Sequence, residues 1–328
     1  MNLNPPSRTH LMTLTDERQQ WQDRLPELKG ECQRRWGLEI GDAIVHRAPS
    51  AVFNVRARGR AAVLKLAVPG AHLTQQAAIL RAAAGQGYVH LYDADLELGA
   101  LLLEHLGPSL QEQGEALYDS LLPTGALAFL QDSKLSQPVI DTLRQVWALP
   151  HELAELPDDS TYKAASLRDL IDGLRTHPQV RPEHAEAIDR ARLYAEQRLS
   201  AREAALMVMC HGDPHPGNLL QVLSPRPGAP TGYVWVDPDG FLCEAEYDLG
   251  VVLRGFNRLV LAADDPVITL RAWCAALAEA TGTDGEAVWQ WSFIERVTTG
   301  LYLIDQGRPR QGLPFLDSAA WLIARRRA

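Results

Sequence analysis

The sequence lacks the features of several common protein classes. It has four cysteines among 328 residues (Cys32, Cys210, Cys243 and Cys274) and no C-x-x-C pair. This scatter excludes a zinc ribbon and a disulfide framework. No apolar run reaches membrane-spanning length, and the first twenty residues lack the apolar core of a signal peptide. We therefore predict a cytoplasmic protein without a membrane segment.

Clustered positive charge is also missing. The net charge is −9, and the basic stretches at 56–60 and 324–328 are short. A nucleic-acid surface needs a clustered basic footprint, because it must neutralise several phosphates. We therefore predict a small-molecule substrate and no nucleic-acid partner. The acidic balance tolerates a cationic ligand, and the oligomeric state cannot be read from the sequence.

Helical patterns flank a short β-rich region near the N-terminus. Thr15-Asp16-Glu17 predicts the start of a helix that continues past Pro26 and ends at Gly37. A second helix is predicted over 72–85, which is rich in helix-forming residues. We expect it to end at the two glycines Gly85 and Gly87.

Alternation of apolar and polar residues marks the strands. Residues 44–68 alternate around breaks at 48–50 and 58–60, which predicts two or three antiparallel strands. Residues 88–107 predict two more strands, joined near Asp93–Gly99. The N-terminal third is therefore expected to be a small antiparallel sheet with one main helix.

After Gly107 the pattern becomes helical. Helical periodicity fills 110–205 and returns from Glu246 to the end, and a β-rich island at 206–242 lies between them. We predict an α+β protein of two lobes, with residues 1–106 as the sheet lobe and 107–328 as the mostly helical lobe.

The stretch HGDPHPGN, residues 211–218, carries the densest polar cluster. Asp213 and Asn218 have four residues between them, and Asp237 follows the next hairpin, which is the layout of a kinase catalytic loop. On that template Asp213 accepts the proton of an attacking hydroxyl. Asn218 and Asp237 offer oxygen ligands to Mg²⁺.

A kinase also needs a lysine on a strand of the sheet lobe. Lys65 in AVLKLA meets this demand, and it is the only lysine between Lys29 and Lys134. Because Lys65 lies far from the loop in sequence, it is a separate match.

Four stretches together resemble the aminoglycoside phosphotransferase family: AVLKLA, HGDPHPGN, VWVDPDG and EYDLGVVLRG. The sequence is most similar to the branch of streptomycin 6-kinases and hydroxyurea phosphotransferases, from about Ser50 to the C-terminus. The resemblance implies a protein-kinase-like fold. It also implies ATP- and Mg²⁺-dependent phosphorylation of a hydroxyl on a small, cationic molecule such as a streptomycin-like aminoglycoside.

The resemblance also implies roles for further residues. ALLLEHLGPSL (100–110) matches the hinge, where backbone groups near Glu104 and Leu106 would contact adenine. Ser50 matches the loop that covers the phosphates. Asp248 matches an aspartate that supports the catalytic loop, and His211 is interpreted as a structural histidine of that loop.

The sequence departs from the kinase pattern in two places. Kinases pair the strand lysine with a helix glutamate, but no acidic residue lies between Lys65 and Asp93. The helix offers only Gln75, Gln76 and alanines, and Ala77 or Ala78 is expected at the position of the glutamate. A nearby glutamine can hydrogen-bond Lys65 without adding charge. Secondly, the loop at residues 47–55 contains no glycine.

Two alternatives remain open. The first is a divalent-metal hydrolase that uses His211, Asp213, His215 and Asp237. The second is a non-catalytic nucleotide-binding relative of kinases, which the missing glutamate motivates.

Two further carboxylates are candidates for substrate binding. Glu244 and Glu246 follow the β-rich island and would line a cationic substrate site, or else form a solvated face.

Overall fold

The chain divides into two compact units. In the computed structural model the described residues are 19–47, 50–113, 133–153 and 156–324. We call Pro6–Pro108 with Leu220–Gly240 the sheet unit, and Ser109–Leu219 with Phe241–Ala328 the helical unit. Segment 220–240, which we assigned to the second lobe, clusters with the sheet unit. The division after residue 106 stays a prediction.

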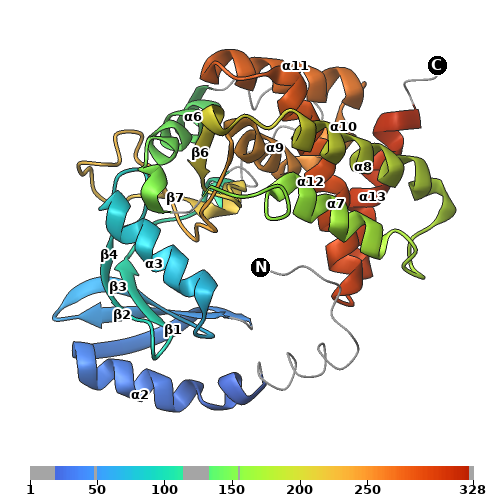
Figure 1. Cartoon of the computed structure of the whole chain (residues 1–328). Helices are drawn as coiled ribbons and strands as arrows, with labels where there is room; N and C mark the ends of the chain where they lie inside the picture. The colour runs from blue at the N-terminus through green and yellow to red at the C-terminus, as the bar shows by residue number, and fades with distance from the viewer. Residues whose placement is uncertain (1–18, 48–49, 114–132, 154–155, 325–328) are drawn as a thin grey trace. The chain divides into compact units, whose positions relative to one another are not determined.

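The sheet unit is built on a five-stranded antiparallel sheet (Figure 1). Its strand order is β1-β2-β3-β5-β4, so β3 lies in the middle. The strands are β1 (Leu38–Arg47), β2 (Ser50–Ala57), β3 (Arg60–Ala67), β4 (Leu91–Asp95) and β5 (Ala100–Glu104). The helices of this unit are α2 (Leu25–Trp36) and α3 (Ala71–Ala83).

The strand breaks occur where the sequence predicts them. Arg58 and Gly59 form the β2–β3 turn with positive φ angles of 49° and 81°. The predicted break at 48–50 falls between β1 and β2, and two of its residues lie outside the described ones. The first strand begins at Leu38, earlier than the predicted alternation, because it pairs with β2 along its whole length.

The predicted first helix is interrupted before Pro26. Residues 19–23 are helical, Arg24 forms a turn, and α2 then begins with Pro26 in its first turn. The first turn tolerates proline because its N–H groups have no partner within the helix. Gly37 ends α2 as predicted, in a left-handed conformation. The expected start at Thr15-Asp16-Glu17 lies outside the described residues.

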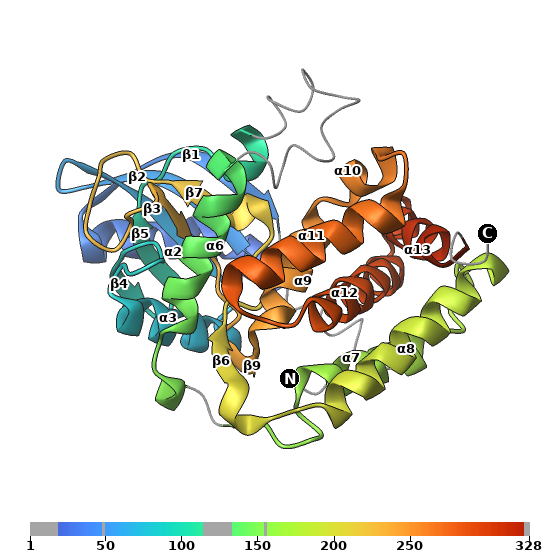
Figure 2. The ribbon, with the colours of Figure 1, turned by 90° about the horizontal axis from the view of Figure 1, so that it is seen from above.

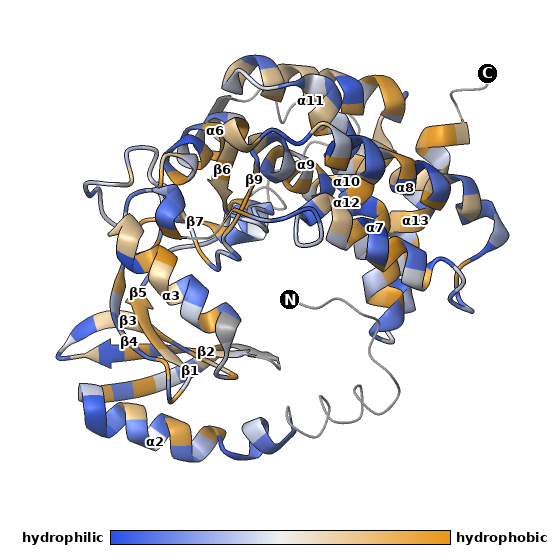
Figure 3. Ribbon diagram, viewed as in Figure 1, coloured by the Kyte–Doolittle hydropathy of each residue, from blue (hydrophilic) through white to orange (hydrophobic). Residues whose placement is uncertain are grey.

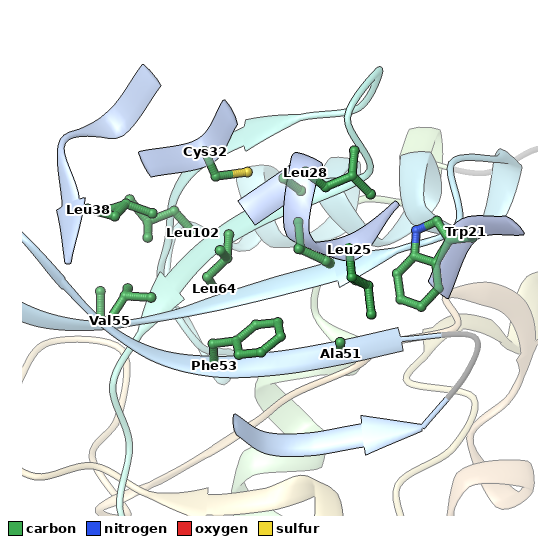
Figure 4. Close-up of a cluster of buried hydrophobic side chains, with 13 residues drawn as sticks. Trp21, Leu25, Leu28, Cys32, Leu38, Ala51, Phe53, Val55, Leu64 and Leu102 are labelled. Carbon is green, nitrogen blue, oxygen red and sulfur yellow. The ribbon is translucent and has the colours of Figure 1, made fainter. Parts of the chain in front are cut away.

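One face of the sheet is covered by the N-terminal helical segment. Figure 3 shows that α2 carries both hydrophobic and hydrophilic residues. Figure 4 shows the cluster between the helix and the sheet. Its members are all at least nine-tenths buried: Trp21, Leu25, Leu28, Cys32, Leu38, Ala51, Phe53, Val55, Ala62, Leu64, Leu66, Ala100 and Leu102. Burial of this apolar surface supplies the main driving force for the unit.

The helical unit is organised around α12 (Gly285–Asp305) (Figures 1 and 2). This helix packs on α13, α9, α8, α11 and α7, and most of its residues are buried. The other helices are α6 (Ser133–Trp147), α7 (Lys163–Leu174), α8 (Ala185–Ser200), α9 (Ala245–Gly255), α10 (Asn257–Ala262), α11 (Pro266–Thr281) and α13 (Pro309–Ala324). Within the described part of the chain, no helix is both long and apolar enough to span a bilayer.

Two short β pairs occupy the predicted β-rich island. β6 (Met207–Cys210) pairs with β9 (Phe241–Glu244), and both belong to the helical unit. β7 (Leu219–Gln221) pairs with β8 (Tyr233–Trp235). The segment between them, SPRPGAPTG at 224–232, is the Pro/Gly-rich turn that predicts such a hairpin. The predicted α+β fold, a small antiparallel sheet with a larger helical lobe, is confirmed.

Gly240 allows the chain after β8 to approach α3. Its φ angle is +64°, and a Cβ atom there would lie 1.7 Å from Ile79 Cδ1. Gly232 has a similar φ of +78° but no atom within 4 Å of such a Cβ. A side chain at Gly232 would therefore meet backbone strain alone, whereas a side chain at Gly240 would meet both backbone strain and steric overlap.

We predict that Gly232→Ala lowers the free energy of unfolding by about 1 kcal/mol, the cost of a left-handed alanine. Gly240→Ala should cost about 1–3 kcal/mol more, because it overpacks Ile79. Chemical denaturation measures both. Equal losses for the two variants would contradict the steric contact, and Ile79→Val should recover part of the Gly240→Ala loss.

Candidate active site

The loop HGDPHPGN connects β6 to β7, and Asp248 of α9 holds its first two residues. The carboxylate of Asp248 accepts hydrogen bonds from His211 N at 2.8 Å and Gly212 N at 3.0 Å. It also accepts one from the indole of Trp147 at 2.9 Å. Asp248 and His211 are fully buried. The supporting roles of both residues stay predictions, and these contacts are consistent with them.

The environment of Asp248 sets two effects against each other. Burial penalises its charged form and raises its pKa to about 6. The hydrogen bonds from Trp147, Gly212 and His211 act in the opposite direction. The backbone of the loop is therefore tied to a carboxylate that has no access to water.

Asp213, the predicted base, makes one close ion pair. Its Oδ1 accepts a hydrogen bond from Arg254 Nη2 at 2.6 Å, and its Oδ2 lies 3.6 Å from His215 Nε2. Burial acts to raise the pKa of Asp213, but the Arg254 guanidinium and then His215 lower it below its ordinary value. The side chain is 37% exposed and is therefore accessible as an ionised acceptor.

The rest of the loop is folded by its own polar groups. Asn218 Nδ2 donates to the backbone oxygen of Asp213 at 3.0 Å, which fixes the amide of Asn218 beside the predicted base. His211 Nδ1 accepts from Asp213 N, and His215 Nδ1 accepts from Gly217 N at 3.1 Å. Both histidines thus stabilise the loop conformation. The helical unit brings together Asp213, Asn218, His211 and Asp248.

The sheet unit brings together Lys65 and Asp237, which are 172 residues apart. Lys65 Nζ donates to Asp237 Oδ1 at 2.8 Å and to Gln76 Oε1 at 3.0 Å. Gln76 Nε2 donates in turn to the same Asp237 oxygen at 3.3 Å. Lys65 is 7% exposed and Gln76 is 1% exposed. Gln76, and not the expected Ala77 or Ala78, therefore occupies the position beside Lys65.

Gln76 stands where kinases place a charged glutamate. Because an amide carries no charge, Asp237 is the only carboxylate paired with Lys65 among the described residues. The helix therefore supplies no carboxylate to Lys65. Gln76 instead accepts a hydrogen bond from Lys65 and donates one to Asp237, the carboxylate that pairs with Lys65.

The backbone of Asp237 is strained. Its φ angle is +56°, in the left-handed region that few non-glycine residues adopt. Such conformations cost on the order of 1–3 kcal/mol and concentrate at functional sites. The strain aims the carboxylate at Lys65 and is consistent with a functional constraint on this residue.

The predicted hinge lies at the end of β5. The Glu104 carboxylate forms a bidentate pair with Arg226 (2.9 and 2.8 Å) and accepts from His90 N at 3.1 Å, so the side chain is fixed. The backbone N–H of Leu106 donates to no other described residue. Ser50 lies at the first position of β2, opposite Ala67.

Glu244 and Glu246 make structural contacts. Glu244 is 9% exposed, and its carboxylate accepts from Trp291 Nε1 at 2.6 Å and lies 3.4 Å from Arg198 Nη1. Glu246 accepts a hydrogen bond from Asp284 N at 3.0 Å. Their predicted role toward a substrate stays a prediction, and the closed surroundings of Glu244 weigh against it.

The comparisons with known proteins identify the family. The family model of aminoglycoside/hydroxyurea antibiotic resistance kinases matches residues 35–307. The chain belongs to this family. It is thus a small-molecule kinase that acts on hydroxyl groups, and the predicted family and enzyme class are confirmed.

Curated relatives of this kinase are bacterial phosphotransferases. A streptomycin 6-kinase of Streptomyces glaucescens is 26% identical over 98% of this chain and 94% of its own length. A hydroxyurea phosphotransferase of Kitasatospora aureofaciens is 40% identical over 25% of this chain and 24% of its own length.

Solved structures share the fold of this kinase. A thermostable mutant of the aminoglycoside phosphotransferase APH(4)-Ia, in ternary complex with ADP and hygromycin B, has a TM-score of 0.59. It is 15% identical, with 90% of this chain and 98% of that chain covered. An ethanolamine kinase of Plasmodium vivax has a TM-score of 0.53 at 13% identity, with 86% and 82% covered.

The family match argues against the hypothesis of a metal hydrolase. No group of three or more His, Cys, Asp and Glu side chains converges in the described part of this kinase. The two histidines of the loop instead accept hydrogen bonds from backbone N–H groups.

Two arginines of the kinase escaped the sequence analysis. Arg254 stands within the motif EYDLGVVLRG, 41 residues from Asp213, and only that motif signalled it. Arg226 lies in the Pro/Gly-rich turn and contacts Glu104 across 122 residues. The sequence could not predict either contact, because helix and strand periodicities relate only residues that are a few positions apart.

We predict that Asp248→Ala lowers the free energy of unfolding by about 3 kcal/mol or more. The substitution removes the partner of two buried backbone N–H donors and of the part-buried Trp147 indole, and each buried donor costs about 1–3 kcal/mol. Asp265→Ala is the matched control, because that aspartate caps α11 at an exposed site and should cost about 1 kcal/mol. Urea unfolding that gives the same loss for both would contradict the buried role of Asp248.

Proposed function

We propose that this kinase transfers the γ-phosphate of ATP, with Mg²⁺, to a hydroxyl of an aminoglycoside-like cationic molecule. The observation that carries the proposal is the geometry of Asp213, which is a partly exposed carboxylate on a loop fixed by buried hydrogen bonds. Streptomycin is the first acceptor to test, because a relative that aligns along almost the whole chain is named streptomycin 6-kinase. The net charge of −9 favours a cationic acceptor.

Asp213 would act as the acceptor of the hydroxyl proton. Phosphoryl transfer depends mainly on positioning and on stabilisation of charge, so the carboxylate must be ionised and held in one orientation. Its lowered pKa and its hydrogen bond to Arg254 support both requirements. The attacking oxygen then forms its bond to the γ-phosphorus as the bond to the β-phosphate oxygen breaks, which gives ADP.

The nucleotide would be bound by the sheet unit. Lys65 offers a fixed ammonium to the phosphates, and Ser50 stands at the start of the strand beside it. The backbone near Glu104 and Leu106 would contact adenine. The N–H of Leu106, which donates to no other described residue, supports this role.

The candidate magnesium ligands, Asn218 and Asp237, provide suitable donor atoms. Asn218 uses its Nδ2 in the loop, which leaves the amide oxygen for a cation. Asp237 offers a carboxylate that is 47% exposed. Carboxylate and amide oxygens are the ligands that Mg²⁺ takes. When bound, the ion would neutralise charge on the phosphates.

A second candidate function is nucleotide binding without catalysis. The uncharged Gln76 beside Lys65 favours it, because the lysine then depends on Asp237 as its counter-ion. Gln76 nevertheless fixes Lys65 at hydrogen-bonding distance, and the predicted base is intact. We therefore rank the kinase activity first.

Product formation separates the two functions. Purified protein, ATP, Mg²⁺ and streptomycin are followed by ³¹P NMR, with a panel of other aminoglycosides and amino alcohols. A new phosphomonoester signal equal to the ADP formed is expected. ATP binding with no phosphomonoester across the panel would contradict the proposed activity and support the non-catalytic alternative.

We predict that Asp213→Ala lowers kcat by roughly 100- to 10,000-fold, the range for loss of a general base. Nucleotide affinity, measured by calorimetry, should change little because the proposed nucleotide contacts lie in the sheet unit. Asp189→Ala, at an exposed ion pair with Arg175, serves as the control. Wild-type turnover in Asp213→Ala would refute the assignment of the base.

Gln76 provides a further prediction. Gln76→Leu removes one hydrogen bond from Lys65 and one from Asp237, so the KM for ATP should rise by about 10-fold or more. Gln75→Leu is the control, because Lys65 donates to Gln76 and Asp237 and not to Gln75, whose amide contacts Gly240 O at 3.4 Å. Gln76→Glu should retain activity, since it restores the usual ion pair. Unchanged steady-state kinetics in Gln76→Leu would show that Lys65 needs no such partner.

A further inference from the structure

Arg254 links Asp213 to a second, buried carboxylate. Its Nη2 lies 2.6 Å from Asp213 Oδ1, and its Nη1 lies 2.9 Å from Glu295 Oε2. Nη1 also donates to Thr299 Oγ1 at 3.2 Å. Arg254 belongs to the last turn of α9, whereas Glu295 and Thr299 belong to α12.

The far side of this arginine is rigidly held. The Glu295 side chain is 6% exposed, and its Oε1 accepts a hydrogen bond from the Tyr247 hydroxyl at 2.8 Å. Tyr247 is 1% exposed and also lies 3.3 Å from Gly212 O of the loop. Because the guanidinium is planar and its donors are fixed, anchoring one nitrogen orients the other toward Asp213.

The anchor makes the two oxygens of Asp213 unequal. Oδ1 is engaged by Arg254, whereas Oδ2 lies 3.6 Å from His215 Nε2, beyond hydrogen-bond distance. Oδ2 is therefore the oxygen that can receive a hydroxyl from a substrate. The pairing with Arg254 selects the side-chain orientation in which it does so.

We propose that Arg254, held by Glu295, is a positioning residue that fixes Asp213 so that its Oδ2 receives the acceptor hydroxyl. This inference rests on the proposed function, in which Asp213 accepts the proton of that hydroxyl. Arg254 acts through Asp213 and not by contact with the reacting atoms. Its loss should therefore change the rate of phosphoryl transfer more than the binding of either substrate.

The test compares Arg254→Met and Arg254→Lys with wild type in steady-state kinetics. Arg254→Met should lower kcat by about 100-fold, the usual effect of misplacing a catalytic group by about 1 Å. Both KM values should stay within about threefold, as expected for an interaction that acts mainly in the transition state. Arg254→Lys keeps the charge without the planar fork and should fall between Met and wild type. Millimolar guanidinium should recover part of the activity of Arg254→Met.

The control is Arg192→Met. Arg192 also bridges two carboxylates, Asp172 and Glu196, each at 2.7 Å, but on the exposed face of α8. Its kcat should match wild type. If Arg254→Met does not fold, Arg254→Lys carries the test. A folded Arg254→Met or Arg254→Lys with wild-type kcat would overturn the proposal.

A double substitution distinguishes this inference from the proposed function. In an Asp213→Ala background, adding Arg254→Met should cause no further loss, because the group that Arg254 positions is already gone. A full additional loss would overturn the positioning role. Wild-type turnover in Asp213→Ala alone would instead overturn the proposed function, whatever Arg254→Met does.

Discussion

The buried contact between Asp248 and the backbone of HGDPHPGN is the interaction on which the candidate active site depends. A single, fully buried carboxylate accepts three N–H donors, so moving or replacing it would cost several hydrogen bonds at once. It fixes the start of the loop on α9. The last turn of the same helix then fixes the side chain of Asp213 through Arg254. Close packing completes the contact, because a Cβ atom on Gly255 would lie 2.6 Å from Pro216 Cδ.

Each unit pairs the charges of its own candidate residues. In the sheet unit Lys65 is paired with Asp237, and the neutral Gln76 contacts both. In the helical unit Arg254 lies between Asp213 and Glu295. An unpaired buried charge costs several kcal/mol, and these pairings avoid that cost for Lys65 and Arg254. The pairing with Asp237 also explains how the chain dispenses with the helix glutamate: the ammonium of Lys65 already has a carboxylate within its own unit.

Short-range patterns in the sequence predicted the features that depend on neighbouring residues, namely strands, turns and the catalytic-loop motif. Alternation and the Arg58–Gly59 turn gave the strands of the sheet, and the spacing of Asp213 and Asn218 identified the loop. Contacts across long stretches of chain were not predictable. The pairing of β6 with β9 and the contact of Arg254 with Asp213 depend on packing around α12, which no short motif encodes. The break at Arg24 was missed because Pro26 fits both a continued helix and a new start.

The rigidity of the loop is the central physical claim, and hydrogen exchange of backbone amides tests it most directly. The amides of His211 and Gly212 donate to the buried carboxylate of Asp248, so they should open only with the core of the helical unit. The account predicts exchange as slow as that of the slowest amides in β6. Exchange as fast as that of the exposed turn amide of Ser160 would show that α9 does not hold the loop, and would contradict the account.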